Sequence, residues 1–315
     1  MIGLGILGLG VQGRRMLTRL PEHGRVRAIA AWDPDPARLE GADVGIARGP
    51  EELVRTPGVD CVFIASPPAL HIPQANLAFD AGKPVFCEKP LSVSAGDARA
   101  AIARIEREGR RAAVNFSLAA SAGLAALLAT VQHGEVGKLR AVEIEVAFQQ
   151  WPRAWQSGAG RWLAERREGG FTREVLSHFV FALQRALGKA TVEKSVACYP
   201  QDGIGAEDGL AARLLAGGVS VTVEGNVAGD APDFNRFTLI GDAATIEFRE
   251  WLATRRVGTG SFEPVARDGR PAYLRQLDQL VAFVEGKPHL LPGFAEAAAV
   301  QETVETMLRP TRSGP

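Results

Sequence analysis

The sequence is poor in cysteine. Its three cysteines, Cys61, Cys87 and Cys198, are odd in number and widely spaced, and none forms a Cys-x-x-Cys pair or a Cys/His cluster. This argues against a disulfide framework and against a structural zinc site, because both need paired or clustered cysteines. Cys61 and Cys87 lie inside apolar runs, so we expect buried, unreactive thiols at both positions.

The sequence also lacks an excess of charge of either sign. Lys+Arg and Asp+Glu both number 36, which leaves no basic surplus for a nucleic acid or an anionic membrane surface. The chain has no uninterrupted apolar run of about 18 residues, and its glycine-broken N-terminus has neither a basic region nor a cleavage site. We therefore expect no membrane span and no signal peptide. The 46% hydrophobic and 23% charged content indicates a folded globular protein, which we expect to be cytoplasmic.

Up to about residue 117, short apolar runs alternate with amphipathic segments, which predicts βαβ units and a parallel sheet. The expected strands are Ile2–Leu7, Val26–Trp32, Cys61–Ala65, Pro84–Cys87 and Ala112–Phe116. The expected helices are Val11–Leu20, His71–Ala81 and Ala95–Glu108. This order predicts a doubly wound α/β Rossmann domain over residues 1–117.

The pattern changes after this boundary, and 315 residues are more than one hydrophobic core usually serves. Successive strands at hairpin spacing predict an open, mostly antiparallel sheet. The expected strands are Leu139–Phe148, Val192–Tyr199, Leu210–Leu215, Val219–Val227, Phe237–Ile240, Thr245–Phe248 and Thr254–Val257. The expected helices are Ala119–His133, Thr172–Leu187, Tyr273–Glu285 and Phe294–Leu308. We therefore expect residues 118–315 to form an α+β domain for substrate binding and oligomerisation.

A glycine loop follows the first expected strand. Gly8, Gly10 and Gly13, with Val11 and Gln12 between them, fit the pattern Gly-x-Gly-x-x-Gly. In a dinucleotide-binding turn these glycines allow a tight bend, close approach to a pyrophosphate and close packing of helix on strand. The pattern is weak alone, since Gly3, Gly5 and Gly8 match it too, but only the later register follows a strand and opens a helix.

Asp33 ends the second expected strand, about 20 residues after the last glycine of the loop. A carboxylate there accepts hydrogen bonds from the adenosine ribose and repels a 2′-phosphate, so we expect NAD to be preferred and NADP to remain possible. A simple turn residue in Asp33-Pro34-Asp35-Pro36 is the alternative interpretation.

Two further motifs end the next expected strands. They are Ala65-Ser66-Pro67-Pro68-Ala69-Leu70-His71 and Gly82-Lys83-Pro84-Val85-Phe86-Cys87-Glu88-Lys89-Pro90. Here the chain resembles the glucose–fructose oxidoreductase / inositol dehydrogenase (Gfo/Idh/MocA) family, with a proline-rich turn followed by a histidine and a Gly-Lys…Glu-Lys-Pro element. The resemblance covers nearly the whole chain and includes Gly134-Glu135-Val136-Gly137-Lys138.

The resemblance implies that Lys89 is catalytic and that Ser66, Pro67, His71 and Glu88 line the nicotinamide half of a cleft. The residues themselves agree, since ligands of open α/β sheets bind at the carboxyl ends of the strands. A lysine there is able to bind a substrate oxygen and stabilise a developing alkoxide. The alternatives are a Glu88–Lys89 surface pair and a packing role for His71.

A second catalytic element of the family, a glycine-rich stretch followed by Asp-x-x-x-His on a helix, matches residues 169–178. Glu174 and His178 are four residues apart, on one face of a helix, where the carboxylate is able to orient the imidazole. Glu174 replaces the usual Asp, so either the longer side chain still reaches the site or Arg173 neutralises it. The simpler interpretation is a solvated helix contact.

Asn115 and three tryptophans are weaker candidates for residues that contact the substrate. Asn115 and Phe116 end the last Rossmann strand, but Ser117-Leu118 follows where the family continues with an Arg-aromatic pair. Trp151, Trp155 and Trp162 crowd one stretch and either cover a substrate pocket or pack in a core or a subunit interface.

These observations predict an NAD(P)-dependent oxidoreductase that acts on a hydroxyl or carbonyl carbon of a sugar, cyclitol or related small polar substrate. His178 would exchange the proton and Lys89 would polarise the oxygen, so that no metal ion is needed. The resemblance also implies a homodimer or homotetramer that pairs through the outer face of the second sheet. A redox-neutral NAD-dependent glycosidase, an imine or carbonyl reductase, and a non-catalytic dinucleotide-dependent regulator are the alternatives.

Overall fold

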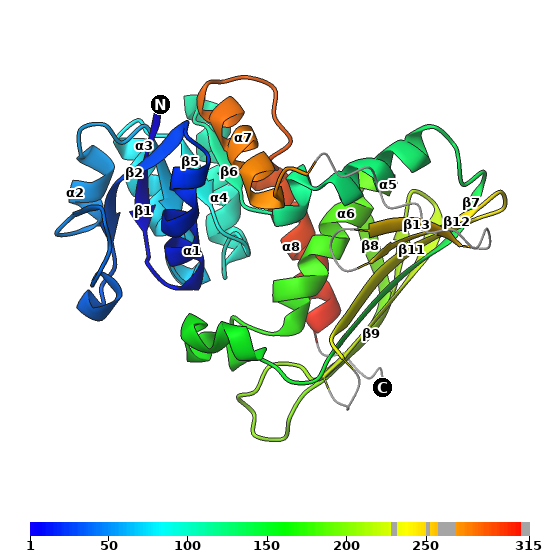
Figure 1. The fold of residues 1–315 in the computed structure, drawn as a ribbon. Coiled ribbons are helices and arrows are strands. Elements are labelled where there is room, and N and C mark those ends of the chain that lie inside the picture. The colour runs from blue at the N-terminus through cyan, green and yellow to red at the C-terminus, as the bar shows by residue number, and fades with distance from the viewer. Residues whose placement is uncertain (228–231, 250–252, 258–268, 310–315) are drawn as a thin grey trace. The chain divides into compact units, whose positions relative to one another are not determined.

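The computed structural model describes residues 1–227, 232–249, 253–257 and 269–309, and the chain divides into two compact units (Figure 1). The first comprises Met1–Ala119 and Pro271–Ala298, and the second comprises Ala120–Arg270 and Ala299–Pro315. This division differs from the expected domains 1–117 and 118–315, because a late segment of the chain packs with the N-terminal unit.

The first unit contains a six-stranded sheet with the order β3-β2-β1-β4-β5-β6, in which all neighbours are parallel. Its strands are β1 (Ile2–Leu7), β2 (Val26–Trp32), β3 (Gly45–Ile46), β4 (Cys61–Ile64), β5 (Val85–Cys87) and β6 (Ala112–Val114). Every residue of β1, β4 and β5 is buried, as expected for apolar strands covered on both faces. The strand order is that of a doubly wound Rossmann sheet, which confirms the predicted fold class.

The helices of this unit are α1 (Val11–Arg19), α2 (Pro50–Arg55), α3 (His71–Asp80) and α4 (Ala95–Glu108). Local chemistry sets the ends of α4. The Ser94 hydroxyl accepts the Asp97 N–H at 3.2 Å, and Gly109, at φ 62°, ends the helix in the left-handed conformation. The sequence pattern predicts α4 with these bounds, whereas α2 and the two-residue strand β3 were not expected from it.

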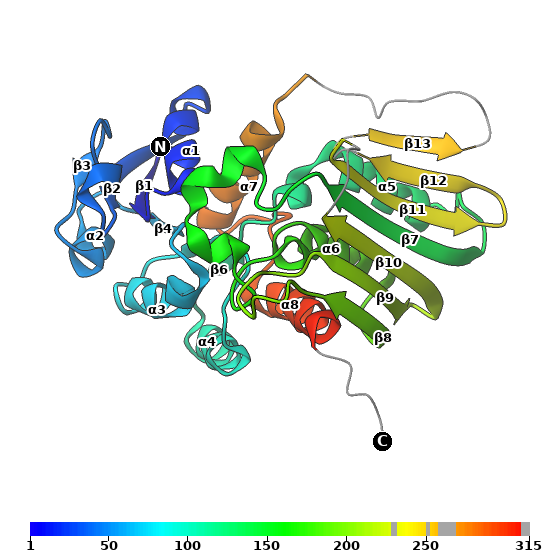
Figure 2. The same ribbon diagram turned by 90° about the horizontal axis from the view of Figure 1, so that it is seen from below.

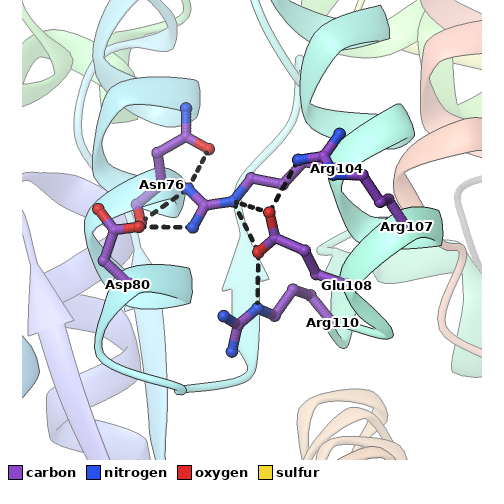
Figure 3. A network of polar contacts seen from close by, with 6 residues as sticks. All are labelled: Asn76, Asp80, Arg104, Arg107, Glu108 and Arg110. Carbon is purple, nitrogen blue, oxygen red and sulfur yellow. Dashed lines mark hydrogen bonds and ion pairs between the residues drawn. The ribbon is translucent and has the colours of Figure 1, made fainter.

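A polar network joins α3 to α4 (Figure 3). The Arg104 guanidinium binds Asp80 and Asn76 on α3 and Glu108 on its own helix. Arg107 and Arg110 also donate to Glu108, and these three arginines lower the pKa of its carboxyl to about 2. The network ties two helices together on the exposed side of the unit.

Helix α7 (Ala272–Val284) belongs to the hydrophobic core of the first unit. Leu277, Leu280 and Val281 join the same cluster of buried residues as Phe63 and Phe86 of the sheet. Two of its last carbonyl oxygens accept hydrogen bonds from a distant residue, since Arg111 Nη1 donates to Val284 at 2.7 Å and to Phe283 at 3.3 Å. Sequence periodicity found this helix but did not indicate on which sheet it packs.

The second unit contains a seven-stranded sheet with the order β13-β12-β11-β7-β10-β9-β8. Its strands are β7 (Leu139–Phe148), β8 (Ala190–Cys198), β9 (Gly209–Ala216), β10 (Val219–Val227), β11 (Phe234–Gly241), β12 (Thr245–Arg249) and β13 (Ala253–Val257). Only the β7–β10 pairing is parallel. The mostly antiparallel sheet that the hairpin spacing predicts is therefore confirmed.

Helices α5 (Ala122–Gln132), α6 (Ser177–Leu187) and α8 (Phe294–Leu308) complete the α-helices of the described residues. Helices α5 and α6 lie on one face of the second sheet (Figure 2). Buried and exposed residues alternate along β9 and β10, so one side of each strand packs on this helical layer and the other side is exposed. No helix in the described part of the chain is long and apolar enough to cross a lipid bilayer.

The predicted helix Thr172–Leu187 is in fact two segments. Residues Thr172–Leu176 form a π-helix, and the α-helix α6 begins at Ser177. Side chains compete for the backbone in this turn, since Glu207 accepts the Thr172 N–H at 2.7 Å and Ser177 Oγ donates to the Arg173 carbonyl at 2.6 Å. Such π segments often occur at functional sites.

Candidate functional site

The predicted glycine loop is the turn between β1 and α1, and close packing requires two of its glycines, Gly8 and Gly13. Gly8 has φ +92°, and a Cβ there would lie 2.8 Å from the Ala65 backbone. A Cβ on Gly13 would lie 1.8 Å from the Gly8 carbonyl oxygen. Gly3, in the competing register, is instead packed inside the sheet against Gly58. The structure therefore gives Gly8 and Gly13 the steric roles expected in a phosphate-binding turn.

Gly10, Val11 and Gln12 lie where helix α1 begins. Gly10 is the N-cap residue of α1. It has an extended backbone conformation, and as a glycine it places no side chain over the first turn of the helix. A Cβ on Gly10 would meet only the end of the Arg38 side chain, at 3.2 Å. The free N–H groups of this first turn, together with the helix dipole, suit a phosphate anion.

Asp33 follows β2 and is held toward the glycine turn. One oxygen of its carboxylate accepts the Leu9 N–H at 2.7 Å, and the other accepts the Asp35 N–H at 2.9 Å. The residue is only 5% exposed, yet each oxygen keeps a second lone pair for a ligand hydroxyl. Asp33 is thus part of the loop geometry and not merely a turn residue.

Arg38 is a residue of this site that the sequence analysis missed. Its Nη1 lies 3.9 Å from Asp33 Oδ2, and its side chain approaches Gly10. Arg14 of α1 fixes the loop by donating to the carbonyl oxygens of Arg38 and Glu40. A search for a basic residue shortly after Asp33 would have found Arg38, since such a residue accommodates a 2′-phosphate.

His71 joins the ends of two neighbouring strands. Its Nε2 lies 2.8 Å from the Ser66 carbonyl oxygen after β4, and its Nδ1 lies 2.8 Å from the Pro90 carbonyl oxygen after β5. A neutral imidazole donates to one of these acceptors, whereas an imidazolium donates to both. The Ser66 hydroxyl donates to buried Gln74 at 2.7 Å, and Pro67 lies directly beside it in the chain. His71 is 1% exposed and therefore connects the segments that carry Ser66 and Lys89.

Lys89 is half-buried directly after β5, and its neighbour Glu88 begins a chain of polar contacts. Asn115 Nδ2, at the end of β6, donates to Glu88 Oε1 at 2.6 Å. Gln276 of α7 donates in turn to Asn115 Oδ1. Glu88 is only 9% exposed, so Asn115 and Gln276 hold the strand end that carries Lys89 through this buried carboxylate. Gln276 was not predicted, because nothing in the sequence indicates that α7 reaches this edge.

Glu174 and His178 lie on either side of the π-to-α transition in the second unit. Glu174 is inside the π-helix and is half-buried, whereas His178 is in the first turn of α6 and is 7% exposed. Neither residue is solvated like a surface ion pair. The structure thus places the predicted acid and imidazole in one buried turn.

The alternative that Arg173 neutralises Glu174 is wrong. The Arg173 guanidinium makes two hydrogen bonds to Glu305, at 2.6 and 2.9 Å, and donates to the carbonyl oxygens of Arg166 and Gly169. Buried Glu207 is a further residue that the sequence analysis missed. Its carboxylate accepts the Thr172 N–H, and burial raises its pKa. Gly170 is the nearby residue that reflects the presence of Glu207, because a Cβ at Gly170 would lie 2.1 Å from Glu207 Oε2.

The three tryptophans differ in their surroundings. Trp151 packs against Phe148 and Phe171, with ring centroids 5.4 and 6.3 Å away, and its indole donates to the Leu163 carbonyl. Trp162 is half-buried, and Trp155 is 55% exposed. Phe171 immediately precedes the π-helix, so the Trp151 cluster links the end of β7 to Glu174 and His178.

The buried cysteines behave as expected. Cys61 and Cys87 are fully buried, and burial raises the pKa of the Cys61 thiol to about 12, whereas Cys198 is exposed. Among the residues that the structure describes, no group of three or more His, Cys, Asp or Glu is arranged to hold a metal ion.

A cavity of about 430 Å³ in the first unit lies away from these residues. It is bounded by α4, the first residue of β6, the end of α7 and the segment around His289. The first residue of β6 marks the amino end of the parallel sheet, whereas Asp33, Ser66 and Lys89 follow the carboxyl ends. The cavity therefore is not part of the predicted cofactor site.

Comparison with known proteins gives two family matches. Residues 2–116 match the model described as "oxidoreductase family, NAD-binding Rossmann fold", and residues 124–247 match the Gfo/Idh/MocA C-terminal domain. Inositol 2-dehydrogenase 1 of Saccharopolyspora erythraea is 36% identical over 117 residues, which is 35% of this chain and 35% of that relative. The match thus spans about a third of the relative's length.

Solved structures share the fold over almost the whole chain. An oxidoreductase from Thermotoga maritima has a TM-score of 0.86 at 19% identity, covering 98% of this chain and 96% of that one. An oxidoreductase from Agrobacterium radiobacter, solved with NAD⁺, L-tartaric acid and magnesium, has a TM-score of 0.81 at 17% identity, covering 96% and 94%. At these identities the likeness concerns the fold.

Proposed function

This chain belongs to the Gfo/Idh/MocA family of oxidoreductases, and from that premise we propose that it is an NAD(P)-dependent dehydrogenase of a small polyhydroxy substrate. The observation that carries the proposal is one edge of the first sheet. The glycine turn, Asp33 and Lys89 all follow the carboxyl ends of parallel strands there, where ligands of such sheets bind.

The residues of this edge fit a nicotinamide dinucleotide. The turn at Gly8 and Gly13 leaves no room for a Cβ, and the first turn of α1 offers free N–H groups to a pyrophosphate. Asp33 keeps lone pairs for the hydroxyls of the adenosine ribose. Ser66, Pro67, His71 and Glu88 would border the nicotinamide half, with His71 fixing the backbone around it.

We propose NAD as the preferred cofactor and NADP as a weaker one. The Asp33 carboxylate repels a 2′-phosphate, which disfavours NADP. Arg38 acts in the opposite sense, since its guanidinium lies beside Asp33 and would pair with that phosphate. The balance between the Asp33 carboxylate and the Arg38 guanidinium would set the preference for NAD over NADP.

Lys89 and His178 would have different chemical roles toward the substrate, one in polarising its oxygen and the other in transferring its proton. When bound, the nicotinamide supplies the hydride acceptor. Lys89 donates a hydrogen bond from its ammonium to the reacting oxygen and stabilises the negative charge that develops there. His178 takes the proton of the substrate hydroxyl, and in the reverse direction it returns it. Glu174, in the same buried turn, would hold the charge and orientation of the imidazole.

The substrate is proposed to be a sugar, a cyclitol or a related small polar molecule. Inositol 2-dehydrogenase 1 is 36% identical over 117 residues, and the Agrobacterium fold relative was solved with L-tartaric acid. Both names describe polyhydroxy compounds, in keeping with a site that has a polarising lysine and a histidine.

We further propose that two or four copies assemble through the exposed face of the second sheet. This face carries Val196 and Leu215, which are 45% and 41% exposed. It also carries a charged cluster in which Arg236 binds Glu145 and Arg249 binds Glu247. Apolar side chains mixed with arginines are typical of protein interfaces. Light scattering of the purified protein measures the number of copies.

The dehydrogenase is tested by nicotinamide absorbance. The protein is mixed with NAD, and separately with NADP, across cyclitols, aldoses and sugar acids. Net reduction by one group establishes the activity and its substrate class. Cofactor binding without reduction anywhere contradicts the dehydrogenase, and cleavage of a glycoside with no added NAD indicates the redox-neutral glycosidase.

A further inference from the structure

Arg153 lies in the loop after β7, within the aromatic cluster that leads to the π-helix. Its guanidinium carbon is 4.8 Å from the ring of Trp155, 5.4 Å from that of Phe148 and 5.7 Å from that of Trp151. Such distances are those of cation–π contacts. Three rings therefore surround one positive charge.

The hydrogen bonds of Arg153 hold only one side of the guanidinium. Its Nε donates to Gln156 Oε1 at 3.1 Å, and its backbone N–H donates to the same oxygen at 3.2 Å. Gln156 is itself 5% exposed, so this anchor is rigid. Among the described residues, Arg153 forms no ion pair and no hydrogen bond through Nη1 or Nη2. The guanidinium is thus held in place through Nε, while the N–H groups of its two terminal nitrogens, Nη1 and Nη2, remain able to donate to a ligand.

Two carboxylates, Asp233 and Glu174, act on the charge of Arg153. Burial lowers the pKa of Arg153, and the charges of Asp233 and Glu174 oppose that shift. Asp233 is exposed and accepts the Gln149 N–H at 3.1 Å, whereas Glu174 is half-buried in the π-helix. The guanidinium therefore lies near the predicted acid without being neutralised by direct contact.

A desolvated cation without an ion-pair partner is unfavourable for folding, since burial of an uncompensated charge costs free energy. The cation–π contacts with the rings offset part of this free-energy cost. An aliphatic side chain at the same position would fill the space with no such cost, so stability alone does not explain an arginine here. A fixed guanidinium with a free fork matches the planar, bidentate geometry of a carboxylate.

We propose that Arg153 is the specificity-determining residue of the substrate site and binds the carboxylate of a polyhydroxy acid. This inference rests on the proposed function for the reaction, but it names the substrate class: an acid in preference to the neutral sugar or cyclitol. The carboxylate lies across Nη1 and Nη2 and supplies the negative charge that the buried guanidinium lacks. Trp155 and Trp151 border the bound acid.

Binding is tested without turnover, by the tryptophan fluorescence of the protein. Aldonic acids, the corresponding neutral polyols and polyol phosphates are titrated into wild type, Arg153→Gln, Arg153→Lys and the control Arg161→Gln. Arg161 is an exposed arginine of the same loop region, so its replacement tests for a general charge effect. Circular dichroism melting checks that each variant is folded.

The expected result is acid binding by wild type that weakens about 10- to 100-fold in Arg153→Gln, because a charge-assisted bidentate contact is lost. Arg153→Lys keeps the charge but loses the fork, so it should fall between the two. Arg161→Gln should bind acids as wild type does. Equal affinity of wild type and Arg153→Gln, or tighter binding of the polyols or of the phosphates than of the acids, overturns the inference.

Turnover separates this inference from the proposed function. Oxidation of acids by wild type, with a loss of kcat/KM confined to acids in Arg153→Gln, supports both. Oxidation of neutral polyols alone, unchanged in Arg153→Gln, leaves the dehydrogenase standing and refutes the role of Arg153. Acid binding that depends on Arg153, with no reduction of any cofactor, refutes the dehydrogenase and supports the carboxylate site.

Discussion

The edge of the first sheet and the buried turn of the second unit are built in different ways. At the sheet edge, backbone atoms do most of the positioning: Gly13 packs on the Gly8 carbonyl, and His71 joins the carbonyls of Ser66 and Pro90. In the turn, side chains distant in sequence do it: Arg173 binds Glu305, and Glu207 accepts the Thr172 N–H.

The difference follows from what each site must recognise. A dinucleotide presents the same pyrophosphate and ribose to every protein that binds it, so a short glycine motif is sufficient. A substrate site needs charges and shapes of its own, and these come from side chains brought together by the whole domain. Substitutions in the glycine turn should therefore weaken cofactor binding, and substitutions in the buried turn should alter substrate recognition.

The largest expected effect is that of Lys89→Ala. Removal of the ammonium that stabilises the developing alkoxide should lower kcat by roughly three orders of magnitude or more. NAD affinity should stay near that of wild type, because the glycine turn and Asp33 are untouched. Steady-state kinetics and calorimetric titration with NAD measure the two. Lys189→Ala, at an exposed lysine that follows α6, is the control, and near-normal turnover of Lys89→Ala would refute the assignment.

Gly13→Ala should reverse this pattern. A Cβ 1.8 Å from the Gly8 carbonyl forces the turn to move, so NAD should bind roughly 100-fold more weakly, while the unit still folds. Gly96→Ala in α4 is the matched control, since its Cβ would make only an ordinary contact at 3.6 Å. Unchanged NAD affinity in Gly13→Ala would mean that the phosphates bind elsewhere.

A smaller effect is expected at the ribose. Asp33→Asn removes the charge that repels a 2′-phosphate and leaves Arg38 beside it, so the ratio of kcat/KM for NADP to that for NAD should rise about 10-fold. Adding Arg38→Gln to the Asp33→Asn variant should return this ratio toward its wild-type value. A ratio that does not respond to either change would remove both residues from cofactor selection.

The smallest effect concerns the pH dependence of folding. Burial raises the pKa of Glu207, so between its ordinary value of about 4.5 and its raised value the folded chain binds more protons than the unfolded chain. Stability is therefore lost as the pH rises through this window. Glu207→Gln keeps an acceptor for the Thr172 N–H and does not titrate, so its free energy of unfolding should fall less from pH 4 to pH 7. Parallel pH profiles in urea unfolding would contradict the buried carboxyl.

The sequence predicted most of the first unit, because each of its features is local. Strands β1, β4 and β5 are apolar runs, α4 has its Ser94 cap and Gly109 stop, and the glycine turn lies between a strand and a helix. The placement of α7 was not predictable, since its apolar face would fit either sheet. The contact of Gln276 with Asn115 depends on that packing and was missed with it.

The second site was predicted less completely. Spacing indicated Glu174 and His178, but it could not show that a π-helix interrupts the segment or that Arg173 binds Glu305. Arg153 looks like any loop arginine in the sequence. Only the packing of three rings and the Gln156 anchor distinguish it.

Hydride transfer between substrate and nicotinamide is followed by isotope transfer from the substrate to the cofactor. The best substrate of the absorbance panel is prepared with deuterium on the carbinol carbon and incubated with the protein and the preferred cofactor. A dehydrogenase should give reduced cofactor that carries one deuterium by mass spectrometry, and Lys89→Ala should lose this product. Reduced cofactor without deuterium, or a converted substrate with no reduced cofactor, would contradict it.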